Sequence, residues 1–184
     1  MTNELLVGLS DGLVALLSIG FASYFRPMLS NHYHLCWFLY FLFSAIGCLL
    51  GGIYHIFVPG QIISPYADWL WAATLLCVGI VALQGLQIIC YFIYPRLNLR
   101  LLAVCLGFIF VVYAYFIIQY PQFKYASLFM GVMVLGQLLL GIVLGLKSRE
   151  WFWGLYLLGW IIYVLGAIIQ FSKISLNSAG FSYN

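Results

Sequence analysis

Charged side chains are scarce in this sequence. Only 6% of its 184 residues are Asp, Glu, Lys or Arg, and 66% are hydrophobic, whereas soluble domains carry about 25% charged residues. Such a chain has too little polar surface to cover itself in water. Its net charge of +3 also supplies too few positive side chains for a nucleic-acid-binding face. The composition therefore excludes a soluble domain and a nucleic-acid partner, and it predicts an integral membrane protein whose partners are membrane lipids.

Paired cysteines, a cleavable leader and polar linkers are lacking as well. The five cysteines lie in or beside apolar runs without CxxC spacing, which is typical of small buried side chains rather than of a metal site. Residues 1–4 contain no basic segment, and no small-residue cleavage site follows the first apolar run, so we expect that run to be retained. Because no polar linker divides the chain, residues 1–184 are expected to form one membrane domain.

Long apolar runs are what the sequence has in abundance. A helix needs about 20 apolar residues to cross the hydrocarbon core, and its backbone groups must be bonded within the segment. Six runs reach this length, and Pro, Gly, Asn and charged residues separate them. They predict an all-α bundle of six membrane spans, over residues 5–25, 35–57, 69–94, 101–120, 125–146 and 151–171.

The basic residues of the predicted loops indicate an orientation. The first, third and fifth loops carry five of the seven Lys and Arg residues, and the opposite side carries two. Because short cytoplasmic loops are enriched in Lys and Arg, we expect the N-terminus outside and a location in the bacterial cytoplasmic (inner) membrane. The five residues are Arg26, Arg96, Arg100, Lys147 and Arg149, and the two are Lys124 and Lys173.

Small and amide side chains predict contacts between the spans. Gly47 and Gly51 are four residues apart, as are Gly141 and Gly145, and this spacing lets two helix backbones approach closely. Amide side chains inside the spans are expected to hydrogen-bond between helices. These are Gln84, Gln87, Gln137 and Gln170.

Three ionisable residues, Asp11, His55 and Asp68, lie inside the first two spans or at the edge of the third. Such residues are costly in lipid and are therefore candidates for a functional site. The start of the first span, the end of the second and the start of the third must lie at one membrane face, so the three residues share it. Two carboxylates and an imidazole suit a metal site or an acid–base pair. Ordinary structural roles are the alternative, namely a helix buttress, an interfacial histidine and a helix cap.

The second span also carries a stripe of small residues on the helix face of His55. This stripe either seats a neighbouring helix or lines a cavity that leads to His55. At the opposite membrane face, His32 and His34 are expected to lie in a loop and to be solvated. The stripe consists of Ser44, Cys48, Gly51 and Gly52.

These features resemble the CREST-type integral membrane hydrolases, which include alkaline ceramidases and progestin and adiponectin receptor-like proteins. The likeness rests on Asp11, on the Gly51-Gly52-Ile53-Tyr54-His55 end of the second span and on Asp68. It is nearest to a bacterial branch with a Gly-Gly-x-x-His segment. The resemblance implies a seven-helix fold in which three histidines hold zinc. It makes His55 a zinc ligand, and Asp11 and Asp68 the catalytic residues, with Asp11 lining the pocket and Asp68 orienting the zinc-bound water.

The function implied by the resemblance is hydrolysis of a lipid amide or ester by metal-activated water. The sequence departs from the family at three points: position 51 is Gly where the family commonly has Ser, no HxxxH pair occurs, and no seventh span is predicted. The chain is then either a six-helix protein with an incomplete zinc site or a truncated seven-helix fold. The alternative is a non-enzymatic membrane protein, which would be a small transporter, a receptor-like protein or an assembly subunit.

Overall fold

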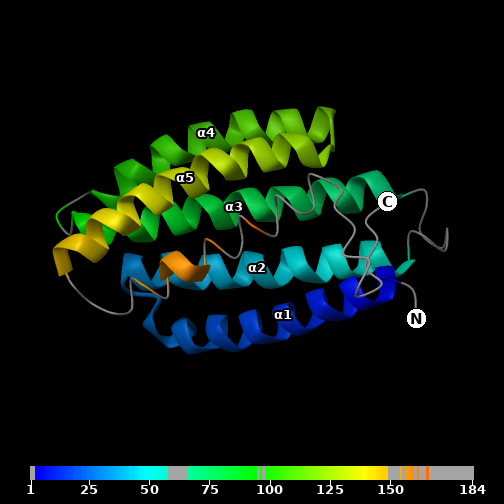
Figure 1. Cartoon of the computed structure of the whole chain (residues 1–184), viewed down its shortest axis with the longest axis horizontal. Helices are drawn as coiled ribbons and strands as arrows, with labels where there is room; N and C mark the ends of the chain where they lie inside the picture. The colour runs from blue at the N-terminus through cyan, green and yellow to red at the C-terminus, as the bar shows by residue number, and fades with distance from the viewer. Residues whose placement is uncertain are drawn as a thin grey trace.

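The computed structural model describes residues 3–57, 66–94, 96 and 98–148, and a few positions beyond them (154, 156–159, 161 and 165). All regular structure in these residues is helical. The helices lie along one axis as an antiparallel bundle (Figure 1). They are α1 (Asn3–Phe25), the 3-10 helix η1 (Arg26–Met28), α2 (His32–Phe57), α3 (Ala67–Ile93), α4 (Leu99–Gln119) and α5 (Phe123–Ser148).

The first five predicted spans are confirmed, and every helix boundary lies within three residues of its predicted position. Among the described residues, five helices are long and apolar enough to cross a membrane. The chain is therefore an all-helical integral membrane protein. The sixth predicted span, 151–171, lies mostly outside the described residues.

Helix α2 begins earlier than predicted because Asn31 caps it. The Asn31 side chain accepts a hydrogen bond from the backbone N–H of Tyr33 at 2.9 Å, which satisfies a group that the first helical turn leaves unpaired. The predicted loop position of His32 and His34 is therefore wrong, because both lie in the first turn of α2 and are half-buried. The Nε2 atom of His32 lies 3.4 Å from the amide nitrogen of Gln87 on α3, so Gln87 does make the predicted contact between helices.

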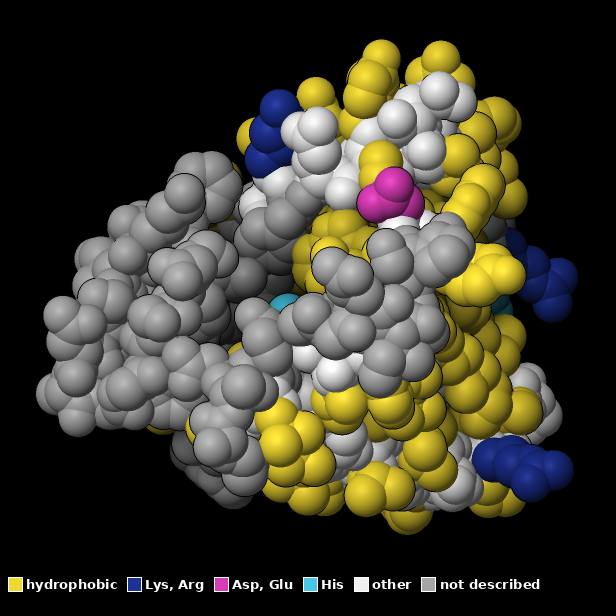
Figure 2. Space-filling model, turned by 90° about the vertical axis from the view of Figure 1, so that its right-hand side faces the viewer, with side chains coloured by type: hydrophobic (Ala, Val, Ile, Leu, Met, Phe, Trp, Pro, Cys, Tyr) yellow, Lys and Arg dark blue, Asp and Glu magenta, His cyan; other side chains and the backbone are white. Residues whose placement is uncertain are grey.

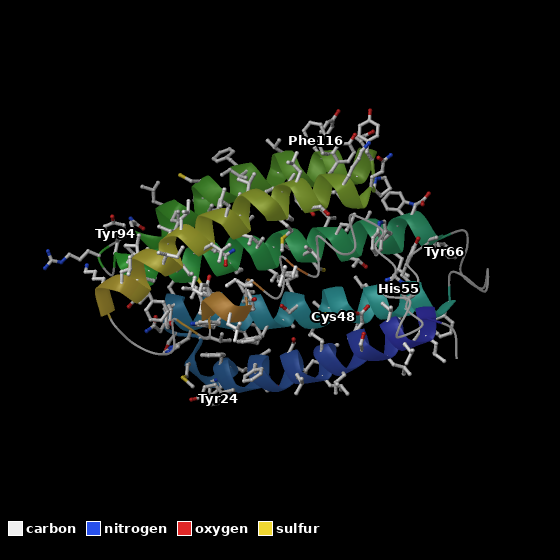
Figure 3. All side chains as sticks on the ribbon, viewed as in Figure 1. Tyr24, Cys48, His55, Tyr66, Tyr94 and Phe116 are labelled. Carbon is white, nitrogen blue, oxygen red and sulfur yellow. The ribbon has the colours of Figure 1, made fainter. Side chains whose placement is uncertain are left out.

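The helix ends gather at two faces of the bundle. His55 and Tyr66 lie at one face, and Tyr24 and Tyr94 lie at the other (Figure 3). We call these faces the His55 end and the Tyr24 end. As predicted, α1 begins, α2 ends and α3 begins at the His55 end (Figure 1).

Helices α3, α4 and α5 form a conventional apolar core. One buried cluster joins Leu83 of α3, Leu106 of α4 and Val134 of α5. A second cluster contains Leu75 of α3 and Ile117 of α4, whose side chains are 2% and 0% exposed. Because lipid is as apolar as these side chains, their close packing rather than water exclusion holds this half together.

Helices α1 and α2 approach each other through small residues instead. A Cβ atom added to Gly52 would lie 3.0 Å from the carbonyl oxygen of Gly8 and 3.3 Å from the Cβ atom of Asp11. Ala15 and Ala22 of α1 are also buried. The two backbones are therefore so close that a larger side chain at Gly52 would push them apart.

Both predicted glycine seams contain a helix contact. A Cβ atom at Gly47 would lie 3.0 Å from the Cβ atom of Cys77 on α3. A Cβ atom at Gly141 on α5 would lie 2.8 Å from the ring of Tyr156. Both contacts are within the chain, so these glycines serve the packing of the bundle itself.

Gln137 confirms the prediction that amide side chains join the helices. Its amide group on α5 donates to the carbonyl oxygen of Ala82 on α3 at 3.1 Å, and the hydroxyl of Tyr156 donates to its Oε1 atom at 3.4 Å. Within the part of the chain that the structure describes, the buried Oε1 atom of Gln84 has no hydrogen-bond partner. Gln170 lies outside the described residues.

Candidate functional site

A cavity of about 480 Å³ follows α2 between α1 and α3. Its walls come from Asp11–Ser18 of α1, Tyr40–His55 of α2 and Trp71–Val81 of α3, and Met130 of α5 closes one side. Between Tyr40 and His55, α2 rises about 22 Å, so the cavity is long compared with its width. Its volume falls in the range of about 300–1,000 Å³ that is typical of small-molecule sites.

The two ends of this cavity differ in polarity. Asp11, His55 and Thr74 line it toward the His55 end, whereas Phe41 and Met130 line it deeper in the bundle. Deeper hydroxyl groups do occur, although Ser and Thr in helices commonly bond to their own preceding turn. The deeper hydroxyl-bearing residues on the wall are Ser18, Tyr40 and Ser44.

Asp11 lies six residues inside the first membrane span, or about 9 Å along the helix axis. Its carboxylate rests against the backbone of α2, because a Cβ atom at Gly51 would lie 3.4 Å from the Oδ2 atom of Asp11. The missing side chains at Gly51 and Gly52 thus make room for the acid between the two helices. They place it on the cavity wall.

His55 lies two residues before the end of α2 and lines the same cavity as Asp11. Its ring stands edge-on to that of Trp71, with 6.3 Å between the ring centroids. Trp71 also packs against Tyr54, at 4.8 Å between centroids. The aromatic neighbours hold the imidazole at the end of the cavity where α2 ends.

Asp68 does not join the other two predicted residues. It is exposed in the first turn of α3, where a carboxylate interacts favourably with the helix dipole. The α3 wall of the cavity begins one turn later, at Trp71. The structure therefore brings together Asp11 and His55, and it places Asp68 at the same end of the bundle but off the cavity wall.

The small-residue stripe of α2 has both of the predicted roles. Gly52 packs against the backbone of α1, while Ser44, Cys48 and Gly51 line the cavity that leads to His55.

The cavity wall also contains residues that the sequence did not predict. Ser18 follows Asp11 by seven residues, on the same face of α1, and this spacing could have identified it. Thr74 and Met130 carry no such signal, because only the packing of α3 and α5 brings them to the cavity.

The donor set at the His55 end does not fit zinc. A catalytic zinc is usually held by three protein ligands. Among the described residues, no group of three or more His, Cys, Asp or Glu side chains could hold a metal ion. On the cavity wall, Asp11 and His55 supply one carboxylate and one imidazole, which is fewer than the three ligands that a catalytic zinc usually has.

A second hollow lies on the lipid-facing side of α1 and α2, toward the Tyr24 end. It measures about 660 Å³, and aromatic and aliphatic side chains such as Phe21, Tyr24 and Trp37 line it. No acidic, basic or imidazole side chain is among the described residues on its wall. Since chemistry and headgroup recognition need such groups, the cavity beside α3 is the candidate functional site.

Figure 2 views the bundle from the His55 end. Hydrophobic side chains cover most of its described part, and charged side chains are few (Figure 2).

Comparison with known proteins identifies one family. The model of a family of unknown function, DUF6962, matches residues 6–184. Neither the curated proteins nor the solved structures contain a significant match.

Proposed function

The chain belongs to DUF6962, a family of unknown function, and we propose that this membrane protein binds an amphiphilic lipid in the cavity between α1, α2 and α3. The observation that carries the proposal is the change in polarity along the cavity. An acid and an imidazole lie at the membrane boundary, and Phe41 and Met130 line the interior. A lipid has the same arrangement, with one polar end and one apolar chain.

The headgroup lies at Asp11 and His55, and the chain extends along α2 toward Phe41. Hydrogen bonds from a headgroup would satisfy a carboxylate that otherwise stands in lipid, where a charged side chain costs about 2.5–3.5 kcal/mol near the bilayer centre. The hydrocarbon chain would fill a space lined mainly by apolar side chains. Because it passes from one apolar environment to another, van der Waals contact rather than the hydrophobic effect favours its entry.

The native cysteines offer a direct test. Cys48 lines the cavity, whereas Cys105 is exposed on α4 away from it. The protein would be treated with N-ethylmaleimide in a non-ionic detergent, with and without dodecanol. Peptide mass spectrometry would then measure how fast each of the two thiols is alkylated. We expect dodecanol to slow the reaction of Cys48 and to leave that of Cys105 unchanged. Equal rates at Cys48 with and without dodecanol would reject the proposal.

The position of the lipid's hydrocarbon chain in the cavity can be tested separately. Ser44→Phe adds a ring to the deep part of the cavity, so it should weaken protection by octadecanol more than protection by octanol. Leu49→Phe is the matched control, because Leu49 is exposed on another face of α2. If both variants respond alike to chain length, the chain does not lie along this wall.

Hydrolysis of the bound lipid, which the resemblance to CREST-type enzymes implies, is a second candidate. The Asp11–His55 pair favours it, because such a pair can move a proton during attack by water. The described residues provide no zinc site, so no step is derived through a metal. Elemental analysis of the purified chain tests this candidate. About one zinc per chain, removed by His55→Ala, would support the zinc enzyme, and zinc-free protein would reject it.

The proposed orientation places the N-terminus and the polar mouth of the cavity outside the cytoplasm of a bacterial inner membrane. The support is the gathering of basic residues at the other end, where α1 ends and α4 begins. Fusion of a reporter that is active only outside the cytoplasm to the residue before α1 should give an active reporter. An inactive fusion with normal expression would reverse the orientation.

A further inference from the structure

The charge on the cavity wall narrows the class of lipid. Among the described lining residues, Asp11 alone carries a formal charge apart from the titratable His55. Both groups can accept hydrogen bonds, the carboxylate always and the imidazole when neutral. The polar end therefore suits a headgroup that donates hydrogen bonds.

The described basic side chains lie elsewhere. Arg26, Arg96, Arg100 and Lys147 stand at helix ends or in turns at the Tyr24 end. Lys124 lies at the other end but on α5, with its ammonium group 4.9 Å from the ring centroid of Tyr125. No Lys or Arg is among the described residues on the cavity wall, so a phosphate or carboxylate headgroup would meet Asp11 without a compensating positive charge.

Trp71 adds an independent preference for a positive headgroup. It lines the same end of the cavity, and its ring lies 6.3 Å from that of His55. The face of an indole ring attracts cations. One end of this largely apolar cavity therefore offers a carboxylate, an imidazole acceptor and an indole. Together they match the three donors and the charge of an ammonium group.

We infer that the preferred ligand of the cavity is a single-chain amphiphile with an ammonium headgroup, taken from the surrounding lipid, and that anionic amphiphiles are rejected. This inference rests on the proposed function. The ammonium group pairs with Asp11, donates to His55 and lies near Trp71. The length of the cavity accommodates one chain beside α2.

The experiment compares three probes that share one chain length: dodecylamine, dodecanol and dodecanoate. Each is titrated at pH 8 in a non-ionic detergent, and protection of Cys48 from N-ethylmaleimide is measured relative to Cys105 in the same sample. We expect dodecylamine to protect at a concentration about tenfold lower than dodecanoate, as for a close charge pair in a poorly solvated site.

Two carboxylate variants distinguish a preference set by the cavity from one set by surface charge. Asp11→Asn keeps the shape of the side chain but removes its charge, and it should reduce the preference for the amine to within about threefold. Asp68→Asn makes the same change at an exposed position off the cavity wall and should keep the full preference.

Equal protection by dodecanoate and dodecylamine, or an unchanged preference in Asp11→Asn, would overturn the inference while leaving lipid binding intact. Loss of the preference in Asp68→Asn as well would assign it to surface charge and also overturn the inference. Absence of protection by all three probes would instead reject the proposed function itself.

Discussion

The two halves of this bundle are held together in different ways. Helices α3, α4 and α5 bury large apolar side chains in shared clusters. Helices α1 and α2 instead meet through glycine beside Asp11 and through stacked aromatic rings toward the Tyr24 end. Close packing of large side chains leaves little free volume. Backbone contact at the α1–α2 seam leaves the space beside it open, and that space is the cavity. The well-packed half, α3 to α5, thus acts as a scaffold, and the cavity lies where α1 and α2 meet it.

The largest effect is expected where the scaffold is most tightly packed. Leu75→Ala removes a side chain that is 2% exposed, so the free energy of unfolding should fall by about 2–5 kcal/mol. Unfolding of the purified protein in mixed detergent measures it. Leu16→Ala is the control, because Leu16 is 68% exposed and faces lipid. Similar losses in the two variants would show that the scaffold core is not what stabilises this half.

A smaller loss is expected at the α1–α2 seam. Gly52→Leu must displace the Gly8 carbonyl or Asp11, and we expect a loss of about 1–3 kcal/mol in unfolding free energy. Dodecanol should also cease to protect Cys48. Gly107→Leu on α4 makes the same change where nothing lies within 4 Å of the added Cβ atom, and it should alter neither quantity. An intact site in Gly52→Leu would mean that backbone contact does not form the cavity.

Removing one hydrogen bond in the scaffold allows stability and ligand binding to be tested separately. The hydroxyl of Tyr113 donates to the carbonyl oxygen of Leu75 at 2.7 Å inside the scaffold. Tyr113→Phe should lower the unfolding free energy by about 0.6 kcal/mol, the average for hydrogen bonds between membrane helices. Protection of Cys48 should stay at the wild-type level. A variant that keeps its stability but loses protection would contradict the division into scaffold and site.

The smallest effect is expected at Gly51. An added Cβ atom would be in ordinary contact, 3.4 Å from Asp11 and 3.5 Å from Thr74. Gly51→Ala should therefore change the unfolding free energy by less than about 0.5 kcal/mol, even though Gly52→Leu, one position away, is disruptive. The comparison is made by the same unfolding assay. A loss as large as that of Gly52→Leu would show that the seam extends farther along α2 than the contacts indicate.

Much of the fold follows from local features of the sequence. Apolar runs of sufficient length form helices in lipid because no other arrangement satisfies the backbone, and this explains why five predicted spans agree with the structure. The boundaries differ where a polar side chain extends a helix. Asn98 illustrates this, since its side chain accepts hydrogen bonds from the N–H groups of Arg100 and Leu101 at 3.1 Å each and starts α4 before the apolar run.

The candidate site could be predicted in part, because topology alone brings Asp11 and His55 to one face. Which way a side chain turns depends on how each helix is rotated in the bundle. That rotation places Asp68 on the surface and Thr74 in the cavity, although both residues belong to α3. The sequence offers no local signal for this choice, which the packing of α3 against its neighbours makes.

The contact between Asp11 and the glycines of α2 has a consequence for membrane insertion. Helix α1 is synthesised before α2 and carries an acid about 9 Å inside its span. The space that receives this acid exists only once α2 lies beside it. The chain between the two helices is short, with η1 and residues 29–31. Insertion of α1 and α2 together as a hairpin therefore avoids a stage in which Asp11 faces lipid alone.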